Sequence, residues 1–215
     1  MSIDTSEWVA LSTRFTPGWP WPEESYGLDP MFGADGWCRG CGTPKGPQSG
    51  ALVMQGRKFP TAGVWMPNWL FDVVCLSGEV AEQVADRFAV ELREVRKPLG
   101  PTSARQLIPT VTRQPWYDPA GLSTAVKARH AKHNPNESGS QCSECSTWKW
   151  LPIGEAEASV QLRSITSATD VVASPEVFGD GLKAFRHLLF RRSLGEFLAG
   201  THPRAWRVVE VAPAV

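Results

Sequence analysis

Residues 69–97, WLFDVVCLSGEVAEQVADRFAVELREVRK, contain the pattern that decides the fold. The apolar run at 70–76 predicts a buried strand, and Ser77 is a residue type that commonly caps a helix. Apolar residues then recur every fourth position, which predicts a helix over 78–88. The approximate alternation at 90–95 predicts a half-buried strand. The segment is therefore interpreted as a strand–helix–strand unit.

Residues 169–211 follow the same plan and predict a second unit. A short apolar strand is expected at 169–173, followed by Ser174-Pro175-Glu176, a strong helix-start motif. We expect that helix over 176–198 and a closing strand over 206–211. Helices on a sheet need a shared core, so the two units predict an α+β fold with mixed or antiparallel sheets and with helices on one face.

The chain between the two units differs in composition. Residues 98–136 are interrupted by prolines and are rich in basic side chains, so we expect a linker loop with a short helix near 122–131. The chain is then either a single domain or two tightly packed lobes. The first lobe would span 1–97 and the second 137–215.

Composition places the chain among globular proteins. It has 215 residues, of which 42% are hydrophobic, with 22 basic and 22 acidic side chains. A net charge of zero argues against a protein that coats nucleic acid or an anionic membrane over its whole surface. The chain holds no apolar run of about 18 residues. Its start, MSIDTSEWVALSTRF, lacks the basic, apolar pattern of a secretory signal, so we expect a cytoplasmic protein with no membrane partner.

The neutral total conceals two oppositely charged stretches. Residues 1–35 contain six acidic residues and only one basic residue, Arg14. Residues 95–136 contain seven basic residues and only one acidic residue, Asp118. Such stretches are either solvated loops or docking surfaces for a partner of opposite charge.

Two C-x-x-C pairs carry the strongest chemical signal. They are Cys38-Arg39-Gly40-Cys41 and Cys142-Ser143-Glu144-Cys145. This spacing lets two thiolates bind one ion from a tight turn, and Gly42 can adopt the positive φ that such a turn often needs. Two such turns complete a tetrahedron, which suits one structural Zn²⁺ in a zinc-ribbon-like site. The pairs lie much further apart than the about 12–20 residues usual in a compact zinc finger, so the ion would join distant parts of the chain.

Other interpretations of the cysteines remain open. A thioredoxin-like pair would begin a helix after a strand, a setting that neither pair has. Disulfides are disfavoured in a reducing compartment. An iron–sulfur centre is compatible with four thiolates. A catalytic zinc would keep a water position open, and four protein thiolates leave none.

Three further residues could belong to a site. His130 and His133 have an H-x-x-H spacing just before the second pair. They could replace a thiolate or hold a second ion, but we expect them in the exposed basic linker. Cys75 lies in the apolar run and is expected to be a small core residue rather than a nucleophile.

Ten tryptophans, many beside proline or glycine, lie where little regular structure is expected. Most should act as plugs that bury large apolar area under loops. Trp19 and Trp21 are the expected exceptions, because exposed tryptophans are frequent at protein-interface hot spots.

Several of these features resemble the double-CXXCG motif proteins first noted in myxobacteria. The similarity follows the order of the two units and of four motifs: Tyr26-Gly27-Leu28-Asp29-Pro30, Trp37-Cys38-Arg39-Gly40-Cys41-Gly42, Cys142-Ser143-Glu144-Cys145 and Leu151-Pro152. Ser146 departs from the pattern, since it stands where the second pair's glycine is expected. Some members of this group are similar to immunity proteins, which implies binding to a toxin protein.

The leading functional hypothesis is therefore a non-enzymatic, zinc-stabilised protein that binds and blocks a protein partner such as a toxin. No Gly-rich phosphate loop, G-x-S-x-G or H-E-x-x-H motif is present. The alternative is a nucleic-acid-associated zinc-ribbon protein that uses the basic 95–136 stretch. An enzyme whose site is assembled from scattered residues is a third possibility. For a protein partner, the acidic residues near Trp19 and Trp21 suit a basic target such as a nuclease, and this is the favoured case. The basic residues of the linker suit an acidic target instead; they are Arg105, Arg113, Lys127, Arg129 and Lys132.

Overall fold

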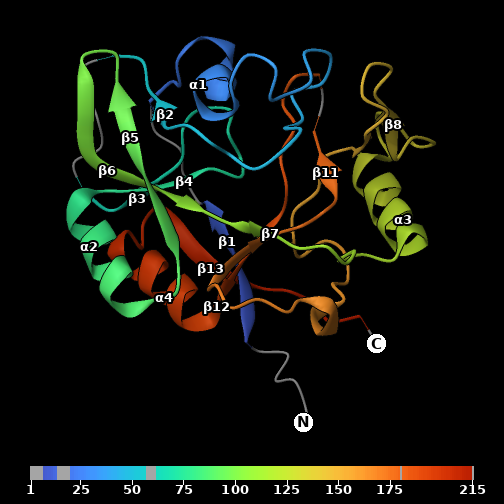
Figure 1. Ribbon diagram of the computed structural model, residues 1–215. Helices are drawn as coiled ribbons and strands as arrows, with labels where there is room; N and C mark the ends of the chain where they lie inside the picture. Colours follow the sequence, from blue (N-terminus) through green and yellow to red (C-terminus); the bar gives the residue numbers. More distant parts are fainter. Residues whose placement is uncertain (1–6, 14–19, 57–61, 180, 215) are drawn as a thin grey trace.

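The structure is a computed structural model that describes residues 7–13, 20–56, 62–179 and 181–214 (Figure 1). As expected, the fold is α+β with mixed sheets, but helices pack on both faces of one sheet rather than on one face as expected. The helices of these residues are α1 (Leu28–Phe32), α2 (Gly78–Arg87), α3 (Pro119–His130) and α4 (Arg192–Thr201), with short 3₁₀ turns η1 (Glu24–Gly27) and η2 (Leu162–Ser164). None of these helices is long and apolar enough to cross a bilayer.

One five-stranded layer, here called the terminal sheet, contains the first and the last strand of the described chain. Its order is β13-β1-β12-β10-β7. Only β10 and β7 pair in parallel; the other neighbours are antiparallel. Strands of both expected lobes thus share one sheet. The strands are β1 (Trp8–Thr13), β7 (Thr110–Val111), β10 (Val171–Ala173), β12 (Leu188–Arg191) and β13 (Trp206–Glu210).

Two further sheets complete the architecture. The middle sheet has the order β2-β5-β6-β4-β3, and the small sheet has the order β11-β9-β8. The middle sheet consists of β2 (Leu52–Val53), β3 (Val64–Trp65), β4 (Val74–Leu76), β5 (Glu91–Lys97) and β6 (Gly100–Ile108). The small sheet consists of β8 (Gly139–Gln141), β9 (Trp148–Trp150) and β11 (Val177–Phe178).

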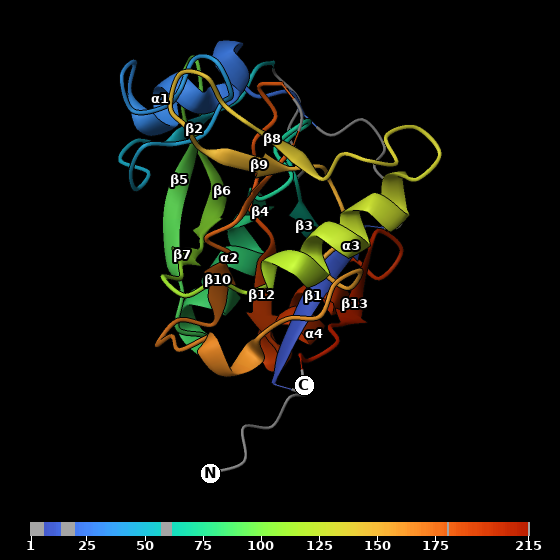
Figure 2. The ribbon, with the colours of Figure 1, turned by 90° about the vertical axis from the view of Figure 1, so that its right-hand side faces the viewer.

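Strands β10 and β12 of the terminal sheet are buried on both faces because they are continuous apolar runs. In β10, Val171 and Ala173 pack in the core that holds α2 and α4, whereas Val172 packs in the core that holds α3. Figures 1 and 2 show α2 and α4 side by side, and α3 on the other side of β1 and β12. Alternate residues of one short strand therefore join two different cores.

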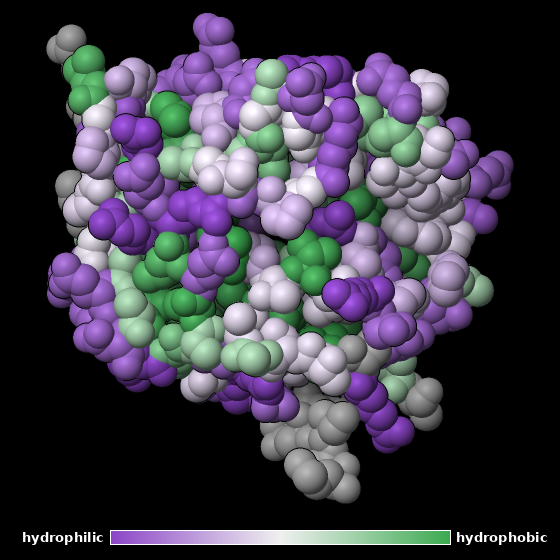
Figure 3. Space-filling view, viewed as in Figure 1, coloured by the Kyte–Doolittle hydropathy of each residue, from purple (hydrophilic) through white to green (hydrophobic). Residues whose placement is uncertain are grey.

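The first expected unit agrees with the observed elements over most of its length. Helix α2 and strand β5 lie where they are expected, and Val80, Ala81 and Val84 are buried on one face of α2. Strand β4 is shorter than expected, because the chain before it turns at Trp69, which has φ 69°. Figure 3 shows apolar side chains gathered over the region of α2 and α4, and polar side chains over much of the remaining surface in view.

The helix expected over 176–198 is wrong. Residues 177–178 are β11, 188–191 are β12, and α4 begins only at Arg192. The chain reverses through Gly179 (φ 128°), where a Cβ would lie 1.8 Å from the carbonyl oxygen of Lys183. Phe178 and Phe185 exchange two backbone hydrogen bonds of 2.8 and 2.9 Å across this reversal. We call the described residues of this reversal, 178–179 and 181–185, the hairpin. The turn at Gly179 therefore interrupts the helix that the apolar spacing predicts over 176–198.

The prediction of a linker loop over 98–136 is also partly wrong. Residues 100–108 form β6, the central strand of the middle sheet. The short helix expected near 122–131 is present as α3. Pro101 is tolerated because it lies beyond the end of β4, where β6 pairs with β5 alone.

Candidate metal centre

The first C-x-x-C pair forms a tight turn that is closed by backbone hydrogen bonds. The amide of Cys38 donates to the Thr43 carbonyl at 2.9 Å, and the amide of Gly42 donates to the Cys38 carbonyl at 2.8 Å. Gly42 has φ 74°, and a Cβ there would lie 2.2 Å from the carbonyl oxygen of Leu182 in the hairpin. Glycine is therefore needed at 42 both for its conformation and for space.

The second pair forms the same turn between β8 and β9. The amide of Cys142 donates to the Thr147 carbonyl at 2.9 Å, and the amide of Ser146 donates to the Cys142 carbonyl at 3.0 Å. Ser146 has φ 58°, so it adopts the left-handed conformation of Gly42, at a cost of about 1–2 kcal/mol for a residue with a Cβ. Ser146 is exposed, which leaves room for its side chain. The departure from glycine at this position thus leaves the turn intact.

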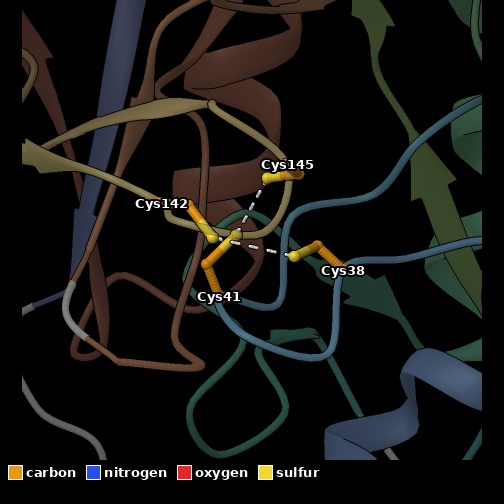
Figure 4. Close-up of side chains that lie close together, drawn as sticks. All are labelled: Cys38, Cys41, Cys142 and Cys145. Carbon is orange, nitrogen blue, oxygen red and sulfur yellow. Dashed lines mark hydrogen bonds between the residues drawn. The ribbon is translucent and has the colours of Figure 1, made fainter.

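The four sulfur atoms of these turns point toward one centre (Figure 4). Cys38 Sγ lies 3.8 Å from Cys142 Sγ, and Cys41 Sγ lies 3.6 Å from Cys145 Sγ. All four sulfurs lie within 4.8 Å of one another. Four bonds of about 2.3 Å in a tetrahedron place neighbouring sulfurs about 3.8 Å apart. The four cysteines are therefore close enough to hold a metal ion.

The donor set fits a thiolate-bound ion rather than disulfides. All four cysteines are free, and the sulfur separations greatly exceed the about 2.05 Å of a disulfide bond. The hydroxyl of Thr43 lies 3.2 Å from Cys41 Sγ, and that of Thr147 lies 3.3 Å from Cys145 Sγ. A hydroxyl at this position can donate to a thiolate and stabilise its charge.

The thiols differ in how readily they lose a proton. Burial raises the pKa of Cys38 to about 12 and also raises the pKa of Cys41. The hydroxyl of Thr147 lowers the pKa of Cys145 to about 6, and backbone amides lower the pKa of Cys142. A cation at the centre would supply the attraction that the two buried thiolates need.

Glu144 joins the two turns directly. Its Oε2 accepts a 2.9 Å hydrogen bond from the Gly40 amide and lies 3.6 Å from Cys38 Sγ. A Cβ at Gly40 would lie 2.6 Å from the Glu144 carboxyl carbon. Gly40 thus allows the second turn to approach the first.

A further contact anchors the first turn to α1. The indole of Trp37 donates to Asp29 at 2.9 Å, and the guanidinium of Arg39 lies 4.0 Å from the centre of the Trp37 ring. Arg39 also pairs with Asp29 at 2.7 Å, and together these groups lower the pKa of Asp29. The segment around Asp29 therefore supports the turn without contributing a ligand.

The other candidate residues lie outside this centre. His130 Nε2 is hydrogen-bonded to the Pro152 carbonyl at 2.8 Å, and His133 is exposed. Within the described ranges, the cluster able to hold a metal contains only the four cysteines. Cys75 is fully buried in the core of the middle sheet, as expected, and burial raises its pKa well above the ordinary value.

The tryptophans divide into buried plugs and exposed rings, but Trp69 and Trp148 are exposed although exposure is expected only for Trp19 and Trp21. Trp19 lies outside the described residues, and Trp21 is exposed as expected. The buried rings are those of Trp8, Trp37, Trp65, Trp116 and Trp206, and the exposed rings are those of Trp21, Trp69 and Trp148.

Sequence reasoning missed three residues that support the centre. Both pairs read C-x-x-C-x-T, so an alignment of one pair with the other would have shown Thr43 and Thr147. Nothing in the local pattern indicates the contact of Glu144 across the two turns, because its partner is distant in the sequence.

Comparison with models of known protein families gives no match, and a search of curated proteins finds no significant similarity. The assignment of function therefore depends on the site and the surface.

Proposed function

We propose that this chain is a non-enzymatic binding protein, stabilised by one structural Zn²⁺, that recognises and neutralises a protein toxin. The zinc ligands would be Cys38, Cys41, Cys142 and Cys145. The observation that carries the proposal is the arrangement of their four sulfurs, with separations of 3.6 and 3.8 Å close to the edge of a zinc tetrathiolate.

Four protein thiolates fill the coordination shell of zinc, so the ion would have no position for water or substrate. Such a site stabilises structure and supplies no catalysis. The resemblance to the double-CXXCG proteins supports a binding role of the immunity type for a protein stabilised in this way.

An exposed aromatic cluster supports the binding role. Trp21 is 48% exposed, Phe71 is 47% exposed and Trp69 is 38% exposed. Their rings form a chain, with centroids 6.3 Å apart from Trp21 to Trp69 and 6.4 Å apart from Trp69 to Phe71. Aromatic residues of this kind supply much of the energy of many protein interfaces. Glu23 and Glu24 lie beside Trp21 in the sequence and favour a basic target such as a nuclease.

Metal analysis tests the zinc centre. The parent should contain one tightly bound zinc per chain, and Cys142→Ser should lose zinc and stability because tetrathiolate binding is coupled to folding. Ser143→Ala is the matched control, since Ser143 lies in the same turn and is exposed. A zinc-free parent, or a Cys142→Ser variant of unchanged stability, would refute the zinc centre.

Co-expression with candidate toxins encoded beside the gene tests the binding role. The parent should protect cells, and Glu23→Lys/Glu24→Lys should protect less than Arg129→Glu/Lys132→Glu. Failure of the parent to protect, combined with salt-sensitive binding to nucleic acid that Arg129→Glu/Lys132→Glu abolishes, would favour the nucleic-acid alternative.

A further inference from the structure

A cavity of about 460 Å³ opens beside the exposed aromatic cluster. Its walls come from the end of β1, the segment 66–71, the segment 152–155 and the hairpin. The volume falls in the range of about 300–1,000 Å³ that is typical of ligand pockets. None of the four cysteines lines it, so it is separate from the candidate metal centre.

Aromatic rings form one wall of this cavity. Trp69, Phe71 and Phe185 line it, and the centroids of Phe71 and Phe185 are 5.4 Å apart. Trp69 has φ 69°, a left-handed conformation that costs a bulky residue energy. Strained residues of this kind occur frequently at binding sites, where the surrounding structure holds a side chain in place.

A cation already lies on this wall. Lys183 Nζ is 3.4 Å from the centre of the Trp69 ring. An ammonium group above an indole face is attracted by the ring electrons. The aromatic wall therefore suits positive charge, and its occupant in the free protein is the chain's own lysine.

A carboxyl group, that of Glu155, also lines the cavity. None of the ion pairs found in the described part of the chain includes it. Burial raises its pKa to about 7. Arrival of a cation would supply the charge partner that this carboxylate lacks.

We propose that the cavity binds an arginine side chain of a protein partner, with its guanidinium on Glu155 and its stem against the aromatic wall. This inference rests on the proposed binding function and assigns it a recognition pocket. Arginine fits better than lysine, because a guanidinium is planar, weakly hydrated, able to stack on aromatic rings and able to bind a carboxylate through two hydrogen bonds. Trp21 and Phe71, exposed beside the opening, would contact apolar residues that flank this arginine in the partner.

The test uses the zinc-loaded full chain and the blocked peptide acetyl-Phe-Arg-Phe-amide. Binding is followed by tryptophan fluorescence and calorimetry. The same peptide with citrulline in place of arginine is the control, since citrulline has nearly the same shape but no charge. The arginine peptide should bind at least about tenfold more tightly than the citrulline peptide, because a charge-assisted hydrogen bond is lost.

Two variants separate the contributions of the cavity. Glu155→Gln keeps the size and a hydrogen-bond acceptor of the side chain but removes its charge, and should weaken arginine-peptide binding by about tenfold or more. Lys183→Met removes the competing cation and should tighten binding. Unchanged zinc content and a single cooperative unfolding transition would show that both variants are folded.

Equal binding of the arginine and citrulline peptides, or a Glu155→Gln variant with the parent's affinity, would overturn the proposal. Agmatine binding as tightly as the peptide would also overturn it, since the cavity would then be a site for a small amine. A toxin captured equally by the parent and by Glu155→Gln would refute the pocket but preserve the proposed function. Peptide binding by a chain that protects against no toxin would preserve the pocket and contradict the function.

Discussion

Gly42→Ala and Ser146→Gly change equivalent positions of the two metal-binding turns, and their effects should have opposite signs. Both positions have positive φ, 74° at Gly42 and 58° at Ser146. Only Gly42 is confined, because a Cβ there would lie 2.2 Å from the Leu182 carbonyl oxygen. The backbone of the hairpin would have to move to admit a methyl group.

The expected magnitudes follow from these two observations. Alanine at 42 would lose about 1–2 kcal/mol through its left-handed conformation and about 1–3 kcal/mol more through the steric overlap, giving a destabilisation of about 2–5 kcal/mol. Glycine at 146 would relieve about 1–2 kcal/mol of strain but lose about 0.5–1 kcal/mol through added freedom of the unfolded chain. Ser146→Gly should therefore be neutral or stabilising by up to about 1.5 kcal/mol.

Urea unfolding in the presence of zinc measures both free energies of unfolding. Gly46→Ala is the matched control, because a Cβ at Gly46 meets nothing within 4 Å and its φ is not positive. That variant should be as stable as the parent or slightly more stable. A Gly42→Ala variant as stable as Gly46→Ala would refute the steric argument. A clear loss of stability in Ser146→Gly would show that Ser146 contributes a contact of its own.

Three other changes test the core and the buried polar groups. Val84→Asp places a charge on the fully buried face of α2 and should cost about 3–5 kcal/mol in urea unfolding; unchanged unfolding would mean that the face is wrongly assigned. His187→Leu removes a 2.6 Å hydrogen bond with the Tyr117 hydroxyl and a 2.9 Å hydrogen bond to the Ile153 carbonyl. It should lower the free energy of unfolding in urea by about 2–4 kcal/mol. An unchanged free energy of unfolding would mean that water replaces both bonds. Burial raises the pKa of Glu155 from 4.5 to about 7, so the native state binds more protons and its stability falls as the pH rises through this window. Glu155→Gln should make the free energy of unfolding less dependent on pH between about 4.5 and 7, and an unchanged slope would contradict this assignment.

Elements with a clear local period could be predicted from the sequence. The spacing of Val80 and Val84 gives α2 its buried face, and the packing of the fold uses that same face. The segment 176–198 has apolar residues at helical spacing as well, but its structure is set by non-local pairing. Residues 177–178 pair with β9, and 188–190 pair with β10. Because their partners are distant in the sequence, no local pattern could decide between helix and strand.

The candidate metal ligands could be predicted because C-x-x-C is a local motif. The cavity could not, because Glu155 and Trp69 come from separate segments and meet only in the folded chain. Neither residue has a local pattern that marks a site. The positive φ of Trp69 could not be predicted either, because the surrounding structure sets it.

The separation of the two cysteine pairs has a small energetic cost. Facing sulfurs are 104 residues apart in the sequence. Closing such a loop costs only about 2 kcal/mol more than closing a loop of about 15 residues, because the closure entropy grows with the logarithm of length. Structural zinc supplies about 10–16 kcal/mol in zinc-finger peptides. An ion at this centre could therefore join distant segments with most of its binding energy retained.

The segments joined at the centre also hold the hairpin that lines the cavity. Gly42, from the first turn, packs against the Leu182 carbonyl. Lys149, on the strand that follows the second turn, donates to the Gly181 carbonyl at 2.5 Å. Both contacts lie within two residues of Lys183, the cation on the aromatic wall. Fixing the two turns on one ion would thus fix the hairpin from both sides, which connects a structural zinc to the geometry of the proposed recognition pocket.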